Sequence, residues 1–349
     1  MQPLFDFDDI LIQPAVISTI NSRADINPYT SYNNHSFLPL ITAPMDTVIN
    51  EKNQSIFKKN KIITTSVRKS DWQLQYDLDS FQAISLQQLQ YLIKKKLKLK
   101  QPVKILVDIA NGHMQSLLDS IKHAKNIYGT NLILMVGNIA NPSTFVELST
   151  AGADYVRVGI GGGSGCLTTV HTAIGYPMGS LIKECRILKR QNNCSAKIVA
   201  DGGMKNYSDI IKSLALGADF VMVGSIFNKA LESAGKTFIQ QNRIDDIKIV
   251  DQFSTKTKKM FNEGIGLYKN FRGMSTKEAQ KAMGSKKIKT SEGVNRIYKV
   301  EYTLAGWVEN FEHYLRSAMS YTNSPKLENF IGNVSYNIIT GKAFERTSK

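Results

Sequence analysis

Cysteine is scarce in this chain, and its scarcity argues against several protein classes. Only three cysteines occur among 349 residues, an odd number without a CxxC pair or a regular spacing. This usage argues against a disulfide-rich scaffold and a structural zinc site, and it favours a reducing compartment. The sequence also lacks a signal-peptide pattern and any apolar run near the roughly 18 residues that a membrane span needs. We therefore expect a cytoplasmic protein that does not enter a membrane.

Acidic residues are in the minority. The chain has 29 Asp and Glu against 44 Lys and Arg, which gives a formal net charge of +15, and its densest basic run is 94–100. Nucleic-acid binding is one interpretation of such charge. Basic runs more often form solvated helix faces, however, and a basic protein equally attracts small phosphorylated molecules. Since the lysines are spread along the whole sequence, we expect a small phosphorylated substrate and no nucleic-acid partner.

The chain alternates strand-like and helix-like segments, which is typical of a parallel α/β architecture. Strands are predicted at residues 38–43, 61–65, 103–108, 132–137, 155–158, 197–201 and 220–224. Several of these runs end in Asp, Gly or Ser, and a (β/α)₈ barrel carries its active site at the carboxyl ends of its strands. A doubly wound sheet is the alternative, but the chain has no GxGxxG fingerprint at the required spacing and no Walker lysine. The fold prediction is a single (β/α)₈ TIM barrel over residues 1–349.

The glycine-dense stretch 159–169 follows one of these strands and contains Cys166. Glycine lets backbone N–H groups approach an anion closely, so the stretch predicts a phosphate site with a thiol beside it. A lone cysteine is more often a small buried residue, and we keep that interpretation for Cys185 and Cys194. The glycines around Cys166 and the hydroxyls of Thr168 and Thr169 favour a nucleophile instead.

Two further strand ends carry the same kind of signal. Asp201-Gly202-Gly203 closes one strand, and Gly224-Ser225 closes the next. Backbone amides at the tips of the last barrel strands commonly bind phosphate. Any one glycine pair could simply serve a tight turn, but their recurrence on consecutive strands favours a binding role.

The sequence resembles the IMP dehydrogenase and GMP reductase family over about residues 5–321. The resemblance is carried by segments 7–11, 43–48, 107–112, 159–169, 175–177, 201–203, 217–222, 271–275 and 291–293. It implies a TIM barrel in which a cysteine thiolate, here Cys166, attacks C2 of a purine mononucleotide. Hydride exchange between that carbon and a nicotinamide cofactor completes the reaction.

Three features favour the reductase, which makes IMP and ammonia from GMP with NADPH. Segment 108–112 resembles the reductase version, the interval 283–292 is too short for the dehydrogenase flap, and the chain has no Arg-Tyr pair. No inserted regulatory domain is apparent either. Other positions, among them Pro44, Ser225 and Arg272, resemble the dehydrogenase. Two alternatives therefore stay open: an IMP dehydrogenase that uses NAD, and a purine-nucleotide-binding protein without turnover.

The resemblance also assigns roles to residues of this chain. Catalysis is expected from Cys166, Thr168, Glu292 and Lys69. Substrate contacts are expected from Met45, Ser164, Asp201, Gly202, Gly203, Gly224, Ser225, Tyr268, Gly273, Met274 and Ser275. Cofactor contacts are expected from Asp108, Ala110, Asn111, Gly112 and Ser317, with NADPH favoured over NADH or NAD. A monovalent cation such as K⁺ could be held at Gly161, Gly163 and Cys166.

Three expectations concern organisation. A lid-like or flap-like excursion is predicted at about 260–302, where Gly, Ser and Lys are frequent and the strand–helix alternation fades. A C-terminal tail at about 335–349 could be flexible. The resemblance further implies a homotetramer.

Overall fold

Eight parallel strands form the centre of the molecule. The computed structural model describes residues 3–32, 35–240, 247–273, 276–277 and 293–347. The strands are β4 (Leu40–Thr42), β5 (Thr64–Thr65), β6 (Ser80–Ile84), β7 (Val103–Asp108), β8 (Leu132–Ile139), β9 (Tyr155–Val158), β10 (Lys197–Asp201) and β11 (Phe220–Val223). They pair in the order β4-β11-β10-β9-β8-β7-β6-β5. A parallel bridge between Ile41 and Ile63 joins the first strand to the last. The architecture is the expected (β/α)₈ barrel.

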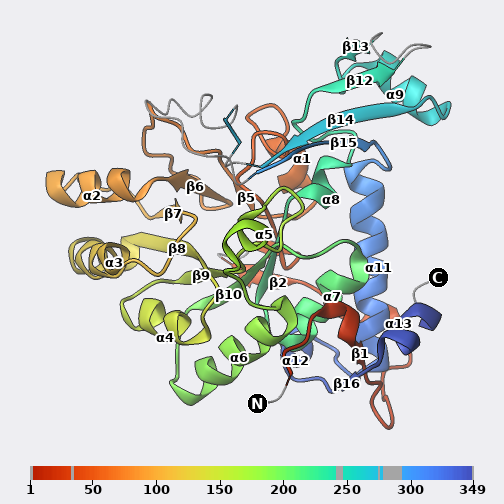
Figure 1. Ribbon diagram of the computed structural model, residues 1–349, viewed down its shortest axis with the longest axis horizontal. Helices are drawn as coiled ribbons and strands as arrows, with labels where there is room; N and C mark the ends of the chain where they lie inside the picture. Colours follow the sequence, from red (N-terminus) through yellow and green to blue (C-terminus); the bar gives the residue numbers. More distant parts are fainter. Residues whose placement is uncertain (1–2, 33–34, 241–246, 274–275, 278–292, 348–349) are drawn as a thin grey trace.

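Helices surround this barrel and mostly alternate with its strands (Figure 1). They are α1 (Gln54–Lys59), α2 (Leu86–Lys95), α3 (Gln115–Tyr128), α4 (Pro142–Thr150), α5 (Thr168–Thr172), α6 (Met178–Gln191), α7 (Tyr207–Leu216), α8 (Ser225–Asn228) and α11 (Leu304–Tyr321). Local sequence fixes several helix starts. Ser85 and Gln88 form a capping box on α2, and Asn141 and Asn206 accept hydrogen bonds from the first turns of α4 and α7. Such caps satisfy backbone N–H groups that have no partner within the helix.

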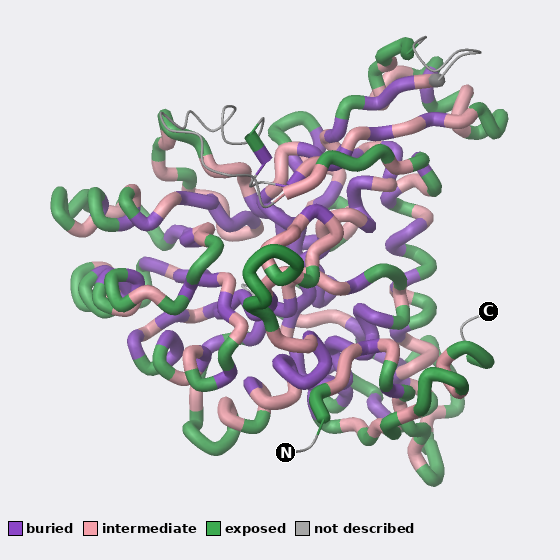
Figure 2. The backbone as a smooth tube through the Cα atoms, in the orientation of Figure 1, coloured by how far each residue is buried: buried purple, intermediate pink, exposed green. Residues whose placement is uncertain are grey.

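The period of two along the strands separates two hydrophobic cores. In β7, Leu106 points into the barrel interior, whereas Ile105 and Val107 pack under the helices, and all three are fully buried. Figure 2 shows this burial along the central strands and the exposed outer turns of the helices. Burying each such side chain contributes roughly 1.5–3 kcal/mol relative to leaving it in water. The double core fixes the strands and therefore the positions of the loops at their ends.

The seven predicted strands are all strands of the barrel, and the eighth barrel strand, β6, was not predicted from the sequence. β6 is buried throughout, but only Phe81 and Ile84 in its five residues are large and apolar. Its polar Gln82 is satisfied inside the fold, because its side-chain amide donates to the carbonyl of Gln73 and accepts from the amide of Gln75. A buried but hydrogen-bonded glutamine hides a strand from a search for apolar runs.

An antiparallel sheet of four strands stands beside the barrel, and we call it the outer sheet. It is formed by β12 (Thr237–Gln240), β13 (Ile247–Val250), β14 (Leu267–Arg272) and β15 (Asn295–Lys299), with α9 (Thr255–Asn262) between β13 and β14. The excursion predicted at about 260–302 thus includes β14 and β15, while its sheet begins earlier, at Thr237. The described helices include none that is long and apolar enough to cross a membrane.

The two ends of the chain meet below the barrel. The remaining elements are η1 (Phe7–Asp9), β1 (Ile10–Ile12), η2 (Arg23–Asp25), β2 (Thr30–Tyr32), β3 (His35–Phe37), η3 (Gly129–Asn131), α12 (Leu327–Phe330), β16 (Tyr336–Ile338) and α13 (Gly341–Thr347). β16 pairs antiparallel with β1, with Ile10 opposite Ile338. The stretch 335–349, which the sequence suggested as a tail, therefore contains a paired strand and a helix.

Lys269 anchors the outer sheet. Its side chain is fully buried, and its ammonium group donates to the carbonyls of Ser233 at 2.7 Å and Gly235 at 3.3 Å. Burial lowers the pKa of Lys269 to about 7, against the opposing attraction of Glu232. The charged form is therefore penalised in the folded protein relative to the unfolded chain.

This burial predicts a pH dependence of stability. Between about pH 7 and the ordinary lysine pKa of 10.5, the unfolded chain holds the Lys269 proton more tightly, so the free energy of unfolding rises with pH. The contribution is at most about 1.4 kcal/mol per pH unit. Lys269→Met should reduce this slope in urea unfolding measured from pH 7 to 9.5. Lys258→Met, at an exposed position on α9, is the matched control, and equal slopes in both variants would contradict the prediction.

Candidate active site

The glycine-dense loop that carries Cys166 leaves the carboxyl end of β9. Its first residue, Gly159, has a φ of +132°, and a Cβ atom there would lie 2.2 Å from the carbonyl oxygen of Asp201. Gly161 also has a positive φ, of +82°. A side chain at either position would be strained, and it would collide with the Asp201 backbone at Gly159 and with the Thr169 side chain at Gly161, so glycine is required for the loop to fold back over the barrel end.

Cys166 is partly buried, and its surroundings are polar. The thiol donates a hydrogen bond to the hydroxyl oxygen of Thr168 at 3.2 Å, and the backbone N–H of Cys166 donates to the carbonyl of Gly163 at 2.9 Å. Cys185, in contrast, is fully buried, and burial raises the pKa of its thiol. The structure thus gives Cys166 a hydroxyl partner that the buried cysteine lacks.

The Cys166 loop packs directly against the end of the outer sheet. A Cβ on Gly273 would lie 2.2 Å from the carbonyl oxygen of Gly165, and a Cβ on Gly165 would lie 3.0 Å from the ring of Phe271. Cys166 also forms an antiparallel bridge with Gly293, and the N–H of Val294 donates to the carbonyl of Gly165 at 3.2 Å. These contacts bring two distant parts of the chain together at the cysteine.

Three predicted site residues, Glu292, Met274 and Ser275, lie outside the described residues. Their neighbours are described. Gly273 precedes the pair Met274-Ser275, and Gly293 follows Glu292 directly in the sequence. Both glycines contact the Cys166 loop.

The glycines predicted to bind phosphate gather around this loop. A Cβ on Gly202 would lie 2.9 Å from the amide nitrogen of Gly163, and one on Gly162 would lie 3.3 Å from the amide nitrogen of Gly203. Gly202 and Gly203 both have positive φ, of +95° and +89°. The loops after β9 and β10 are therefore in backbone contact.

Unsatisfied polar groups mark the same region. The hydroxyl oxygen of Ser164 is buried and has no hydrogen-bond partner in the described part of the chain. Within those residues, the backbone N–H groups of Gly203, Gly224 and Ser225 also make no hydrogen bond. Beside them, a Cβ on Gly224 would lie 3.3 Å from the sulfur of Met45. A buried hydroxyl normally finds a partner, and the three amides belong to half-buried residues, so this group of donors suits an anion with several oxygens.

A buried arginine lies at the centre of the strand ends. Arg157 on β9 donates to Asp108 on β7 at 2.7 Å and to Asp201 on β10 at 2.8 Å. Asn138 on β8 adds a donor to the same oxygen of Asp201 at 2.7 Å and another to the carbonyl of Gly159 at 2.9 Å. Burial alone would lower the pKa of Arg157, but the two carboxylates raise it. Asp108 and Asp201, predicted for different ligands, thus share one cation.

Sequence reasoning missed Arg157 and Asn138. Arg157 stands in a run interpreted only as a strand, and Asn138 directly follows another such run, although a charged residue in the otherwise apolar β9 was a usable signal. A charge is rarely fully buried unless it is paired. Arg157 therefore implied a nearby carboxylate, and the two aspartates at neighbouring strand ends were the candidates.

The predicted cofactor segment 108–112 lies at the end of β7. Gly112 is held tightly, since its N–H donates to the carbonyl of Asn138 at 2.7 Å and a Cβ there would lie 2.7 Å from the same oxygen. Ala110 and Asn111 are exposed beside it. Nearby, Arg68 donates to the carbonyl of Asp108 at 3.0 Å.

The remaining predicted residues are more dispersed. Lys69 is exposed and pairs with Glu51 at 2.7 Å, an interaction that raises the pKa of the lysine. The ring of Tyr268 stacks on Phe238 in the outer sheet, whereas Phe271 of the same strand contacts the Cys166 loop. Ser317 lies on α11, across the barrel from β7 in Figure 1.

The described residues hold no cluster of three or more His, Cys, Asp or Glu that could bind a metal ion. The cation prediction at Gly161, Gly163 and Cys166 concerns backbone carbonyls instead. The carbonyl of Gly163 already accepts the N–H of Cys166. That bond leaves it one further lone pair for a cation.

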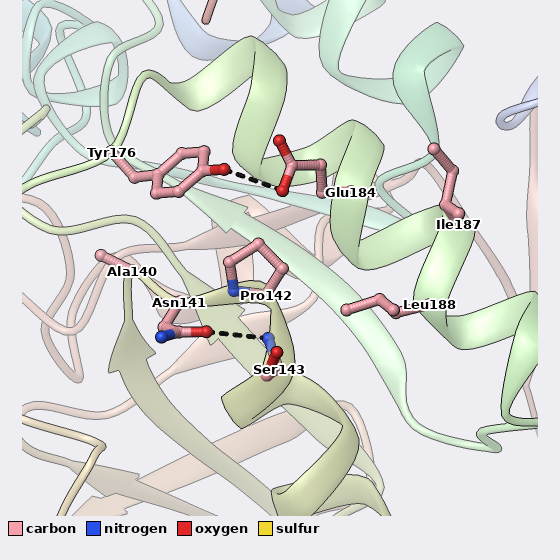
Figure 3. Close-up of a pocket in the computed structure, with 8 residues that line it drawn as sticks. All are labelled: Ala140, Asn141, Pro142, Ser143, Tyr176, Glu184, Ile187 and Leu188. Carbon is pink, nitrogen blue, oxygen red and sulfur yellow. Dashed lines mark hydrogen bonds between the residues drawn. The ribbon is translucent and has the colours of Figure 1, made fainter. Parts of the chain in front are cut away.

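A pocket of about 490 Å³ lies between α4 and α6 (Figure 3). Tyr176 donates to Glu184 across it at 2.7 Å, and Ile187 and Leu188 form an apolar wall. Burial and, to a smaller extent, the hydrogen bond to Glu184 together raise the pKa of Tyr176 to about 12. None of the predicted site residues lines this pocket.

Comparison with known proteins identifies relatives across nearly the whole chain. Residues 82–348 match the family model described as the IMP dehydrogenase / GMP reductase domain. A GMP reductase of Oceanobacillus iheyensis is 30% identical over 99% of this chain and 98% of its own length. A GMP reductase of Streptococcus suis is 30% identical over 78% of this chain and 82% of its own. One from Bacillus cereus is 28% identical over 99% and 98%.

The contact between Gly165 and Gly273 yields a prediction. Gly273→Ala places a methyl group against the Gly165 carbonyl, so the Cys166 loop must move away from the outer sheet. We expect a loss of stability of about 1–3 kcal/mol and faster alkylation of Cys166 by iodoacetamide. Gly341→Ala, where a Cβ would meet nothing within 4 Å, is the control. An unchanged alkylation rate in Gly273→Ala would show that the contact does not hold the loop.

Proposed function

The chain belongs to the IMP dehydrogenase / GMP reductase family and is an oxidoreductase, and from that premise we propose that it reduces a guanine mononucleotide. The proposed reaction is the NADPH-dependent reductive deamination of GMP, or of a close guanine nucleotide, to IMP and ammonia. The observation that carries this proposal is the position of Cys166. Its thiol bonds to Thr168 and its backbone pairs with Gly293, beside a cluster of unsatisfied phosphate-binding groups.

The nucleotide phosphate is proposed to bind Ser164 and the amides of Gly203, Gly224 and Ser225. Ser164 supplies a buried hydroxyl without a partner among the described residues, and the three amides point to no other acceptor there. The ribose is proposed to bind Asp201. Only one oxygen of that carboxylate is occupied by Arg157 and Asn138, so the other can accept hydroxyl hydrogen bonds. Met45 beside Gly224 would then contact the base.

The residues at the end of β7 fit a nicotinamide cofactor. Asp108 keeps one carboxylate oxygen without a partner in the described part of the chain, and the side chain is 18% exposed. Arg68 and Lys69 add positive charge suited to a cofactor phosphate. A reduced nicotinamide bound there would supply a hydride to C2 of the purine.

Cys166 is proposed to act as the nucleophile. Its thiolate adds to C2 of GMP, and the bond from C2 to the amino nitrogen then breaks, which releases ammonia and leaves a thioimidate. Addition of hydride at C2 and departure of the thiolate give IMP. Covalent catalysis of this kind divides one difficult substitution into two easier steps.

Thr168 and Glu292 are proposed to handle the proton that ammonia needs in order to leave. Thr168 is already hydrogen-bonded to the nucleophile, and Glu292 directly precedes Gly293, which pairs with Cys166. A carboxyl acid could pass its proton through the threonine hydroxyl to the leaving nitrogen.

A homotetramer is the assembly that we propose with this function. Ser317 belongs to α11, which Figure 1 shows on the other side of the barrel from β7, the strand that ends at Asp108. If both residues contact one cofactor, they do so from two subunits. Light scattering coupled to size-exclusion chromatography measures the assembly.

An IMP dehydrogenase is the second candidate. At Arg272 the sequence resembles the dehydrogenase. This residue forms an ion pair with Asp46, which follows the proposed base contact Met45. NADPH oxidation with GMP, compared with NAD reduction with IMP, distinguishes the two activities by absorbance at 340 nm. We expect turnover with GMP and NADPH. Turnover only with IMP and NAD would establish the dehydrogenase, and no turnover with either pair would favour a binding protein.

Cys166→Ala should abolish turnover, because no covalent intermediate can form, while GMP binding by calorimetry stays within a few-fold of the wild type. Cys194→Ala removes a partly buried thiol that follows α6 and should retain full activity. Full activity in Cys166→Ala would remove the mechanism.

Thr168→Val removes the hydroxyl but keeps the shape of the side chain. We expect kcat to fall by roughly 10²–10⁴-fold, the usual contribution of proton transfer by a positioned group. GMP affinity should change little. The matching test for the carboxyl group is Glu292→Gln, which should show a comparable fall, and normal kcat in both variants would exclude the proposed proton route.

A further inference from the structure

We propose that Arg157 is a positioning residue that couples the nucleotide site to the cofactor site. The inference rests on the proposed function, because it takes Asp201 as the ribose contact and Asp108 as a cofactor contact. One guanidinium bonds to both carboxylates, at 2.7 Å and 2.8 Å, and Asn138 adds a second donor to Asp201 only. A ligand that fixes one aspartate can therefore restrict the position of the other aspartate through Arg157.

Each aspartate uses only one of its two oxygens for hydrogen bonds to side chains of the described residues. Arg157 bonds to Oδ1 of Asp108 and to Oδ2 of Asp201. Within the described residues, the second oxygen of each carboxylate makes no hydrogen bond, and the two side chains are 18% and 17% exposed. An incoming hydroxyl can thus bond to the free oxygen of one aspartate while the other oxygen of that aspartate stays on Arg157.

The electrostatics make the three groups interdependent. The Arg157 side chain is only 7% exposed, so its charge is largely removed from water. A buried cation needs its carboxylate partners, and breaking such a set by removing one member is costly because charge is left unpaired. The positions of both aspartate carboxylates consequently depend on the position of Arg157.

The backbone of β8 is shaped to admit this arginine. Gly137 has a φ of +133°, and a Cβ there would lie 2.5 Å from the Arg157 carbonyl and 2.8 Å from its Cβ. The pairing of β8 with β9 is irregular between Val136 and Ile139. A glycine at this irregularity leaves room for Arg157 to reach past β8 to Asp108 on β7.

This arrangement predicts positive coupling between the ligands. A nucleotide that fixes Asp201 also restricts Arg157 and, through it, Asp108, so the cofactor then pays a smaller ordering cost. By linkage, the cofactor must tighten nucleotide binding by the same factor. Arg157→Lys keeps the charge, but a single ammonium group cannot reproduce the two-sided fork of the guanidinium.

The test uses IMP with NADPH, a pair that cannot exchange hydride because both members are in the reduced state. Calorimetry gives the affinity of the full-length protein for IMP with and without saturating NADPH. We expect NADPH to tighten IMP binding at least about fivefold in the wild type. In Arg157→Lys the ratio of IMP affinities with and without NADPH should fall to within about twofold of one. The affinity for IMP alone and that for NADPH alone should each fall by a smaller factor than this ratio does.

Two further variants separate positioning from damage. Gly137→Ala displaces Arg157 without altering any proposed ligand contact, and it should lower the coupling factor in the same direction. Arg316→Lys alters an arginine on α11 that pairs with Glu312, and it should leave the factor unchanged. Thermal unfolding shows whether each variant is folded. If either Arg157→Lys or Gly137→Ala is not folded, the test rests on the other one.

The outcomes distinguish the two proposals. If the wild type binds neither IMP nor NADPH, the proposed function fails. If both bind but the wild type shows no coupling, or Arg157→Lys and Gly137→Ala retain the wild-type factor, only the coupling inference fails.

Discussion

The buried ion pairs of Arg157 with Asp108 and Asp201 are the interaction on which the ligand end of this barrel depends. Three strands contribute these residues, and Asn138 on a fourth strand joins them. In a parallel barrel the carboxyl ends of the strands carry the reactive groups. If all the strand ends were apolar, their side chains would pack together as core and leave no polar group at this end of the barrel. The buried arginine instead keeps two carboxylates there, each with one oxygen that makes no hydrogen bond within the described residues.

Close approach of backbones is the second constraint, and it explains the glycines better than flexibility does. Gly165 meets Gly273, Gly202 meets Gly163, and Gly159 meets the carbonyl of Asp201, each at distances that leave no space for a Cβ. Loops from separate strands can thereby pack main chain against main chain. Within the described residues, the N–H groups of Gly203, Gly224 and Ser225 and the buried hydroxyl of Ser164 are left without hydrogen-bond partners.

The sequence predicts the barrel well because its strands are mostly apolar runs that end in Asp, Gly or Ser. It fails at β6, where Gln82 is buried and satisfied by hydrogen bonds, which no apolar pattern reveals. The loop of Cys166 was found because glycine density is a local signal. Arg157 was missed because its role depends on partners about 45 residues away on either side along the chain. Likewise, resemblance favoured Tyr268, while the structure places Phe271 of that strand against the Cys166 loop.

The outer sheet connects the proposed base contact to the nucleophile. Arg272 at the end of β14 pairs with Asp46, the residue after Met45. The next residue, Gly273, packs against Gly165, the residue before Cys166. Two adjacent residues of one strand end therefore fix both sides of the proposed purine position. Lys269 ties the same strand to the turn at 233–235 through two backbone carbonyls, so this strand holds the proposed base contact and the thiol in one arrangement. In the proposed mechanism, orientation of the reacting groups by this sheet would lower the barrier to attack at C2.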